Sequence, residues 1–381
     1  MAYDIQVKLT MRFKKIYLYY FLIKIFYLFF AIFIFSKLTT LGDTPRYLNS
    51  GVGFSFKVFY SSTELMDFLG NSLKKIFYFD IIACFPFLLL SFYGVYYAVK
   101  KLNLHYAGIL LMILLSMPNF GIWTSILSKE AVGCFYSGIL GVLIINFYNG
   151  NFKVKAIDVL ALYLCFIFKP PYFVFIIQAL IFLRIVNGFK FSTGLVSILA
   201  VFMLLFNVGA IYLFREEIDL AARALYVHFT NFGDPDLAKS TRENAFEEQF
   251  DFFRKMPFGM FISFFGPTVT EMLDKPTHLL SGIESTLILL LFFFLSLRSL
   301  LRPVLHYRFN PKLLFIYLLL FSGFLFSNYP FGILNPGSAV RYRENFYLIF
   351  VIMLVYLYIR SKMNSQSIKY RKLNDHFIYN S

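Results

Sequence analysis

Charge is scarce in this chain, and negative charge is the scarcest part of it. Charged residues make up only 15% of the 381 residues, and 36 Lys and Arg stand against 21 Asp and Glu, which gives a formal net charge of +15. Hydrophobic residues reach 59%, Phe alone occurs 52 times, and the mean hydropathy is +0.67. A soluble domain of this length cannot bury so much apolar surface. The composition therefore predicts an all-α, polytopic integral membrane protein.

Cysteine and histidine are also few, with three and five residues respectively. Cys84, Cys134 and Cys165 all fall in apolar stretches, so their spacing shows no disulfide or zinc framework. His228 and His278 lack the spacing of metal ligands. We therefore predict no metal site.

The long apolar runs predict about ten transmembrane helices within one domain, residues 1–381. Each is close to the roughly 20 residues that a bilayer requires, or shorter. The third and fifth are short, and they run into Pro118 and into Pro170 and Pro171, as broken or tilted helices beside a cavity do. The predicted spans are 16–36, 77–98, 107–118, 131–148, 156–168, 171–186, 195–214, 281–297, 313–327 and 344–360.

The distribution of charge predicts the orientation of these spans. With the N-terminus inside, only Asp4, Asp158 and Asp375 among the acidic residues lie on the inner side, and the positive charge gathers there. This alternation accounts for the basic composition without a nucleic-acid partner. Both termini are then cytoplasmic, including a basic tail at 361–381. A first outer loop covers 37–76, and one larger outer loop covers 215–280. The larger loop contains a strongly charged stretch from Arg242 to Arg254, which we expect to be helical with a solvated face.

Residues 118–133 interrupt the apolar pattern at an outer helix end. This stretch contains the only Trp of the chain, Trp123, followed by the adjacent pair Lys129 and Glu130. Trp123 can stack on a sugar ring or belong to an interfacial aromatic belt. Lys129 can hold a phosphate, and the alternative is a local Lys129–Glu130 pair that caps the next helix.

Two further outer segments carry candidate site residues. Asp43 and Arg46 stand on a Gly- and Pro-containing turn just after the first span, followed by Tyr47, whose ring is a second candidate for stacking on a sugar. A carboxylate there can accept a proton from a sugar hydroxyl, or it can cap a helix and pair with the neighbouring Arg46. Lys169 lies at a proline break with no acidic neighbour, which favours a role in binding.

The last two candidate segments combine carboxylates with arginines. Glu284 lies one turn inside the eighth predicted span, where a carboxylate is a candidate functional group. Arg341 and Arg343, beside Glu344, precede the tenth span. Two guanidinium groups at a membrane boundary suit a pyrophosphate, and the alternative is a pair of interfacial anchors.

All these residues lie at outer helix ends or in outer loops, and none lies at mid-bilayer. An ion-coupled transporter places its charged sites near the midplane, so the pattern disfavours that class. It favours a site at the outer interface that meets a lipid-linked substrate.

Three short motifs resemble those of membrane glycosyltransferases of the GT-C type, especially the O-antigen and capsule polymerases (Wzy). They are Gly42-Asp43-Thr-Pro-Arg46-Tyr47, then Pro118…Trp123-Thr-Ser-Ile-Leu-Ser-Lys129-Glu130, and Arg341-Tyr-Arg343; the stretch Pro267…Leu280…Glu284 is also similar. The resemblance spans most of the chain. It departs from the two large periplasmic loops often described for Wzy, since the last outer loop here is short.

This resemblance implies a GT-C-like fold in the bacterial inner membrane and a periplasmic active site. The reaction would transfer a growing glycan from one undecaprenyl pyrophosphate to a repeat unit on another. It would need no nucleotide sugar, no obligatory metal and no other cofactor. Membrane lipids, a flippase and a chain-length regulator are the implied partners. Asp43 is then the candidate base, with Glu284 or Glu130 as alternatives, and Arg341, Arg343, Lys129, Lys169 and Arg46 hold the pyrophosphate.

Two other functions fit the same sequence. One is a GT-C transferase that uses a polyprenyl-phosphate sugar, for which Asp43 is again the base. The other is a flippase or exporter of lipid-linked oligosaccharide, which predicts charges along a mid-membrane lumen that the sequence does not show.

Overall fold

The computed structural model describes residues 2–189, 191–231, 241–243, 245–298 and 311–378, and within these ranges the ordered elements are all helices. The all-α prediction is therefore confirmed. Eight helices are long and apolar enough to cross a membrane. They are α1 (Ala2–Phe33), α4 (Asp80–Leu102), α7 (Lys129–Tyr148), α9 (Pro170–Gly188), α10 (Thr193–Leu213), α15 (Pro276–Ser296), α17 (Pro311–Leu334) and α18 (Pro336–Ile378).

The two remaining predicted spans form shorter helices. Residues 107–118 form α5 (Ile109–Leu115), which ends before Pro118, and Pro118 then begins the separate short helix α6 (Pro118–Trp123). Proline suits the first turn of a helix because it lacks the N–H that would be unpaired there. Residues 156–168 form α8 (Ala156–Phe168), which has 13 residues. The count of ten spans stays a prediction, while the predicted break at Pro118 is present.

Helix α7 is the centre of the bundle. It packs against α4, α8 and α18, and almost every residue along it is buried. A close crossing of α4 and α7 depends on two glycines, because a Cβ on Gly94 or Gly138 would overlap the backbone of the other helix. Small residues allow such approaches between helices in membranes, where packing rather than water exclusion drives association.

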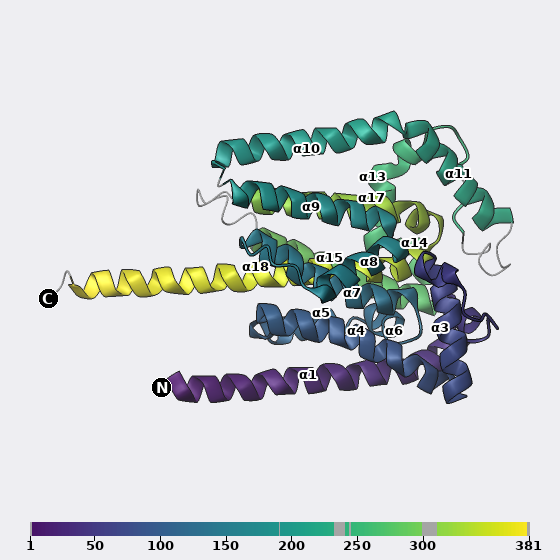
Figure 1. Cartoon of the computed structure of the whole chain (residues 1–381), viewed down its shortest axis with the longest axis horizontal. Coiled ribbons are helices and arrows are strands. Elements are labelled where there is room, and N and C mark those ends of the chain that lie inside the picture. Colours follow the sequence, from purple (N-terminus) through teal and green to yellow (C-terminus); the bar gives the residue numbers. More distant parts are fainter. Residues whose placement is uncertain (1, 190, 232–240, 244, 299–310, 379–381) are drawn as a thin grey trace.

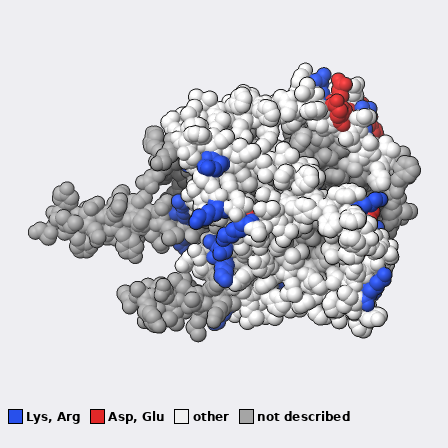
Figure 2. Space-filling model, viewed as in Figure 1, with Lys and Arg blue, Asp and Glu red and all other residues white. Residues whose placement is uncertain are grey.

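The two ends of the bundle differ in content. Both termini lie at one end, and α3 (Ser62–Phe77), α11 (Arg215–Asn231) and α14 (Val269–Asp274) lie at the other, which we call the distal end (Figure 1). On the face shown in Figure 2, charged side chains gather toward the two ends and leave a nearly uncharged belt between them. Such a belt is what a bilayer requires.

The segment 215–280 is less of a loop than the sequence predicted. The expected charged helix from Arg242 to Arg254 is wrong, because helix α13 (Asp251–Phe265) begins only at Asp251 and packs against α17 and α18. Aromatic burial decides this: Phe252 lies 4.8 Å from Tyr329 of α17, ring centre to ring centre. Arg242 instead donates to Gly332 O and Ile333 O at the end of α17, both at 2.8 Å.

Candidate functional site

A polar cavity of about 780 Å³ opens at the distal end of the bundle. Five parts of the chain line it: the segment 38–43, α6, α11, the junction of α14 and α15, and the corner between α17 and α18. Three of the residues predicted from sequence line this cavity directly, namely Asp43, Trp123 and Arg341. The structure thus brings together residues about 300 positions apart.

Asp43 is held between two arginines at the cavity. Its Oδ2 accepts a hydrogen bond of 3.1 Å from Arg341 Nη2, and its Oδ1 lies 3.8 Å from Arg46 Nη1. Asp43 stands at the N-cap of the short helix α2 (Thr44–Leu48), but its side chain makes no capping hydrogen bond. The carboxylate, 37% exposed, therefore faces the cavity instead of serving the helix.

Gly42 allows Arg341 to reach this carboxylate. Gly42 has a left-handed backbone with φ +56°, and a Cβ there would overlap the Arg341 guanidinium. Glycine alone adopts this conformation at no steric cost. The Gly-Asp pair of the first motif is thus explained by one close contact with α18.

Arg341 is the cation at the centre of the site. Besides Asp43, its Nε lies 3.4 Å from Glu130 Oε1, and its guanidinium carbon lies 5.8 Å from the centre of the Trp123 ring and 4.9 Å from that of Tyr342. Glu130 is buried and lies behind Arg341 rather than on the cavity surface. This places Glu130 as a partner of Arg341 rather than as a second base.

Lys169 lies at the edge of the cavity, at the break between α8 and α9. Its Nζ is 4.3 Å from the centre of the Tyr342 ring and 5.9 Å from that of Phe331, and both rings line the cavity. Burial lowers the pKa of Lys169 to about 8, and the charges of Glu130 and Arg341 shift it in opposite directions. A nearby phosphate would favour the charged ammonium.

Lys129 and Tyr47 lie near the site but do not line it. Lys129 Nζ donates to Ser62 Oγ at 3.2 Å and to Thr63 Oγ1 at 2.9 Å, both on α3. The cap of α7 comes from Ser128, whose hydroxyl accepts from Ala131 N. Tyr47 is 1% exposed, so the predicted stacking of its ring on a sugar has no support in this geometry.

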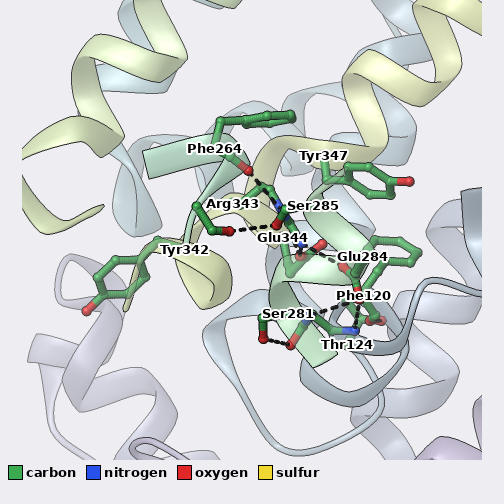
Figure 3. A network of polar contacts seen from close by, with 12 residues as sticks. Phe120, Thr124, Phe264, Ser281, Glu284, Ser285, Tyr342, Arg343, Glu344 and Tyr347 are labelled. Carbon is green, nitrogen blue, oxygen red and sulfur yellow. Dashed lines mark hydrogen bonds and ion pairs between the residues drawn. The ribbon is translucent and has the colours of Figure 1, made fainter. Parts of the chain in front are cut away.

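Arg343 and Glu284 lie in a separate buried network. Arg343 Nη2 is 2.6 Å from Glu284 Oε1 and 3.0 Å from Glu344 Oε1, while its Nη1 donates to Ser285 Oγ and to Phe264 O. Figure 3 shows the Arg343 side chain turned into this network and Tyr342 pointing away from it. Arg343 is 0% and Glu284 3% exposed.

The second oxygen of Glu284 holds α6 in place. Glu284 Oε2 accepts from Asn119 N at 2.6 Å and from Asn119 Nδ2 at 2.9 Å. Glu284 and Arg343 are buried, and their polar atoms contact interior partners instead of the cavity. Their predicted roles, base and pyrophosphate ligand, stay predictions, while the contacts that the structure gives them lie between α6, α15 and α18.

A buried lysine fixes the other end of α6. Lys24 of α1 is 1% exposed, and its Nζ donates to Thr124 O at 2.5 Å and to Thr124 Oγ1 at 2.7 Å, just after the end of α6. A cation there interacts favourably with the carbonyl end of a helix. The sequence contained a clue, because Lys24 is the only charged residue inside the first predicted span.

Several cavity residues were not predicted from sequence. Tyr342 stands between the two arginines of the last motif, so the motif itself pointed to it. His228, Lys275 and His278 also line the cavity, on α11 and at the start of α15. Within the described ranges, no cluster of three His, Cys, Asp or Glu side chains could hold a metal ion.

In comparisons with known proteins, no family model, curated protein or solved structure matches this chain. The interpretation of the site therefore depends on its own chemistry. The cavity offers a carboxylate that can accept a proton, a guanidinium that can bind phosphate, and aromatic rings that can contact a sugar, and the Lys169 ammonium lies beside two of these rings.

Proposed function

We propose that this protein is a membrane glycosyltransferase that joins polyprenyl-pyrophosphate-linked glycans, as an O-antigen or capsule polymerase does. The observation that carries the proposal is the placement of the Asp43 carboxylate beside Arg341 in a polar cavity at one end of a membrane bundle. Proton acceptance and pyrophosphate binding are needed side by side in this reaction. The resemblance of the three motifs supports the same assignment.

In the proposed step, an acceptor hydroxyl attacks the anomeric carbon of the donor glycan. The new C–O bond forms while the bond from that carbon to the pyrophosphate oxygen breaks. The hydroxyl proton passes to Asp43, and the electron pair of the broken bond stays on the departing pyrophosphate. Arg341 and Lys169 offset the negative charge that develops there.

The hydrogen bond between Arg341 and Asp43 holds both side chains at the cavity before substrate binds. A pyrophosphate at Arg341 competes with Asp43 for the guanidinium, so its arrival loosens the carboxylate. Glu130 stays buried behind Arg341 and keeps the guanidinium aimed at the cavity. The Asp43–Arg341 contact thus orients Arg341 before substrate binds, and its loss when pyrophosphate binds leaves the Asp43 carboxylate available as the base.

The membrane face follows from the charge distribution. Net positive charge concentrates in the segments at the end of the bundle where both termini lie. We therefore assign the termini to the cytoplasm and the cavity to the periplasmic face of a bacterial inner membrane. Lipid-linked glycans would then be joined outside the cytoplasm.

The test uses a strain that lacks its own copy of the gene and makes long surface polysaccharide. Asp43→Asn keeps the size of the side chain and removes the proton acceptor, so we expect about 10²- to 10⁴-fold slower transfer. Gel analysis of the lipopolysaccharide should show a core that carries a single repeat unit instead of a ladder of long chains.

The matched control is Glu216→Gln, which removes an exposed carboxylate from the same end of the bundle but outside the cavity. It should give chains of normal length. A normal ladder from Asp43→Asn would contradict the proposal. A core with no repeat unit at all would point to a flippase instead.

A further inference from the structure

An apolar groove of about 530 Å³ lies directly beside the polar cavity. It is formed mainly by α9, α11 and α17, and its walls include Pro171, Val174, Ile218, Ala221, Leu225 and Phe331. Among the described residues that line the groove, Ser327 has the only polar side chain, and its hydroxyl donates to Gly323 O within its own helix. These residues therefore offer hydrocarbon contacts and no free polar group from a side chain.

The groove and the cavity share a wall. Leu225 of α11 and Phe331 of α17 line both of them. Lys169 lies at this boundary, with its Nζ near the rings of Phe331 and Tyr342. The Lys169 ammonium thus lies where the apolar groove meets the polar cavity.

The groove is also open on its outer side. Val174 is 50% exposed, and Pro171 and Ala221 are exposed as well. Val174 belongs to α9 and the opposite wall belongs to α17, and both helices are candidate membrane spans. Hydrocarbon can therefore reach the groove sideways from a bilayer.

We propose that this groove binds the isoprenoid tail of one lipid-linked substrate, whose phosphate lies at the boundary beside Lys169 and Arg341. This proposal rests on the proposed function for the identity of the lipid. It follows from the continuity of an apolar groove with a cationic cavity, which fits one amphiphilic molecule better than two separate ligands. The glycan then extends into the cavity past Trp123 toward Asp43.

The test measures binding to the purified full-length protein by native mass spectrometry. The probes are undecaprenyl phosphate and geranyl phosphate, which share a headgroup and differ in tail length. Ala221→Phe adds a ring at the open side of the groove, and Ala224→Phe adds the same ring on α11 at an exposed position outside the groove. Val174→Trp fills the groove from α9 and serves as an independent second variant.

We expect Ala221→Phe and Val174→Trp each to weaken binding of undecaprenyl phosphate at least about tenfold, because the long tail loses its contacts. Binding of geranyl phosphate should stay unchanged, and Ala224→Phe should match the native protein with both probes. Equal binding of undecaprenyl phosphate by the native protein and both groove variants would overturn the proposal. So would an equal loss of both probes, which would show general damage.

Failure of the proposed function gives a different pattern. If Asp43→Asn leaves polymerisation intact but the groove variants lose the long lipid selectively, the groove assignment stands and the reaction assignment falls. If Asp43→Asn abolishes polymerisation while the groove variants bind the long lipid normally, the groove assignment alone falls.

Discussion

Arg341 and Arg343 are two residues apart and lie in opposite environments. Residues at i and i+2 of a helix point about 200° apart, so one side chain faces the cavity when the other faces the interior. Arg341 is 16% exposed and lines the cavity, whereas Arg343 is fully buried between two glutamates. A motif of two arginines that suggests a single anion site in the sequence therefore divides into one residue at the cavity and one in the interior.

Lys169 gives a prediction at the residue scale. Its pKa of about 8 means that the free protein loses the Lys169 proton as the pH rises through that value. If the ammonium binds phosphate, kcat/KM should fall above about pH 8, while kcat should change less because bound phosphate retains the proton. Lys169→Arg should remove this fall, since arginine stays charged throughout the range.

The measurement is the pH profile of glycan transfer by the purified protein with lipid-linked donor. Lys153→Arg, at an exposed position at the other end of the bundle, is the control and should keep the native profile. An identical alkaline fall in Lys169→Arg and the native protein would assign that fall to another group.

At the scale of elements, the short helix α6 connects the buried networks to the cavity. Glu284 of α15 holds its first turn through Asn119, and Lys24 of α1 holds its end at Thr124. A helix of six residues has too few internal hydrogen bonds to be stable alone, so these contacts fix its position. Because α6 is fixed, the position of Trp123, which lines the cavity at the end of α6, is fixed as well.

This arrangement predicts the effect of Glu284→Gln. The change leaves the buried Arg343 paired with Glu344 alone and weakens the hydrogen bonds to Asn119, so we expect a loss of about 1.5–3 kcal/mol in stability. Equilibrium unfolding in mixed detergent micelles measures that loss. Because Trp123 is the only Trp, its fluorescence should also shift to longer wavelength when α6 loosens.

Glu216→Gln again provides the control, since Glu216 is 70% exposed on α11. It should alter neither the unfolding curve nor the fluorescence. Native stability together with unchanged Trp123 fluorescence in Glu284→Gln would show that the network does not position α6.

At the scale of the whole molecule, every group of the proposed site lies at the end of the bundle opposite the termini. The three native cysteines are buried, with exposures of 0–1%, so they give little background for labelling. Lys275→Cys places a thiol at the cavity, and Lys153→Cys places one at the opposite end. In cells with a permeabilised outer membrane, an impermeant maleimide should label the first at least about tenfold faster than the second.

Equal labelling of the two variants after the inner membrane is also opened provides the control for thiol reactivity. Faster labelling of Lys153→Cys in cells with an intact inner membrane would reverse the orientation. It would move the cavity to the cytoplasmic face and exclude the periplasmic reaction.

The sequence by itself determined the class of the molecule, because so many apolar residues in runs of this length fit only a membrane bundle. It also located the breaks at Pro118 and Pro170, since proline acts locally. Asp43, Trp123 and Arg341 were among its candidates, because charged residues and the only Trp stand out beside apolar spans. The sequence did not show that residues 242, 243 and 245–250 lie outside a helix, because contacts of Phe252 and Arg242 with α17, far along the chain, determine their conformation.

Only the tertiary structure decided which charged residues share a site. Burial and pairing depend on contacts between α6, α7, α15 and α18, and no local pattern contains them. Those contacts place Glu284 and Arg343 in the interior, Glu130 behind Arg341, and Asp43 and Arg341 at the cavity. They also set the apolar groove beside the cavity, because three helices distant in sequence must meet to form it.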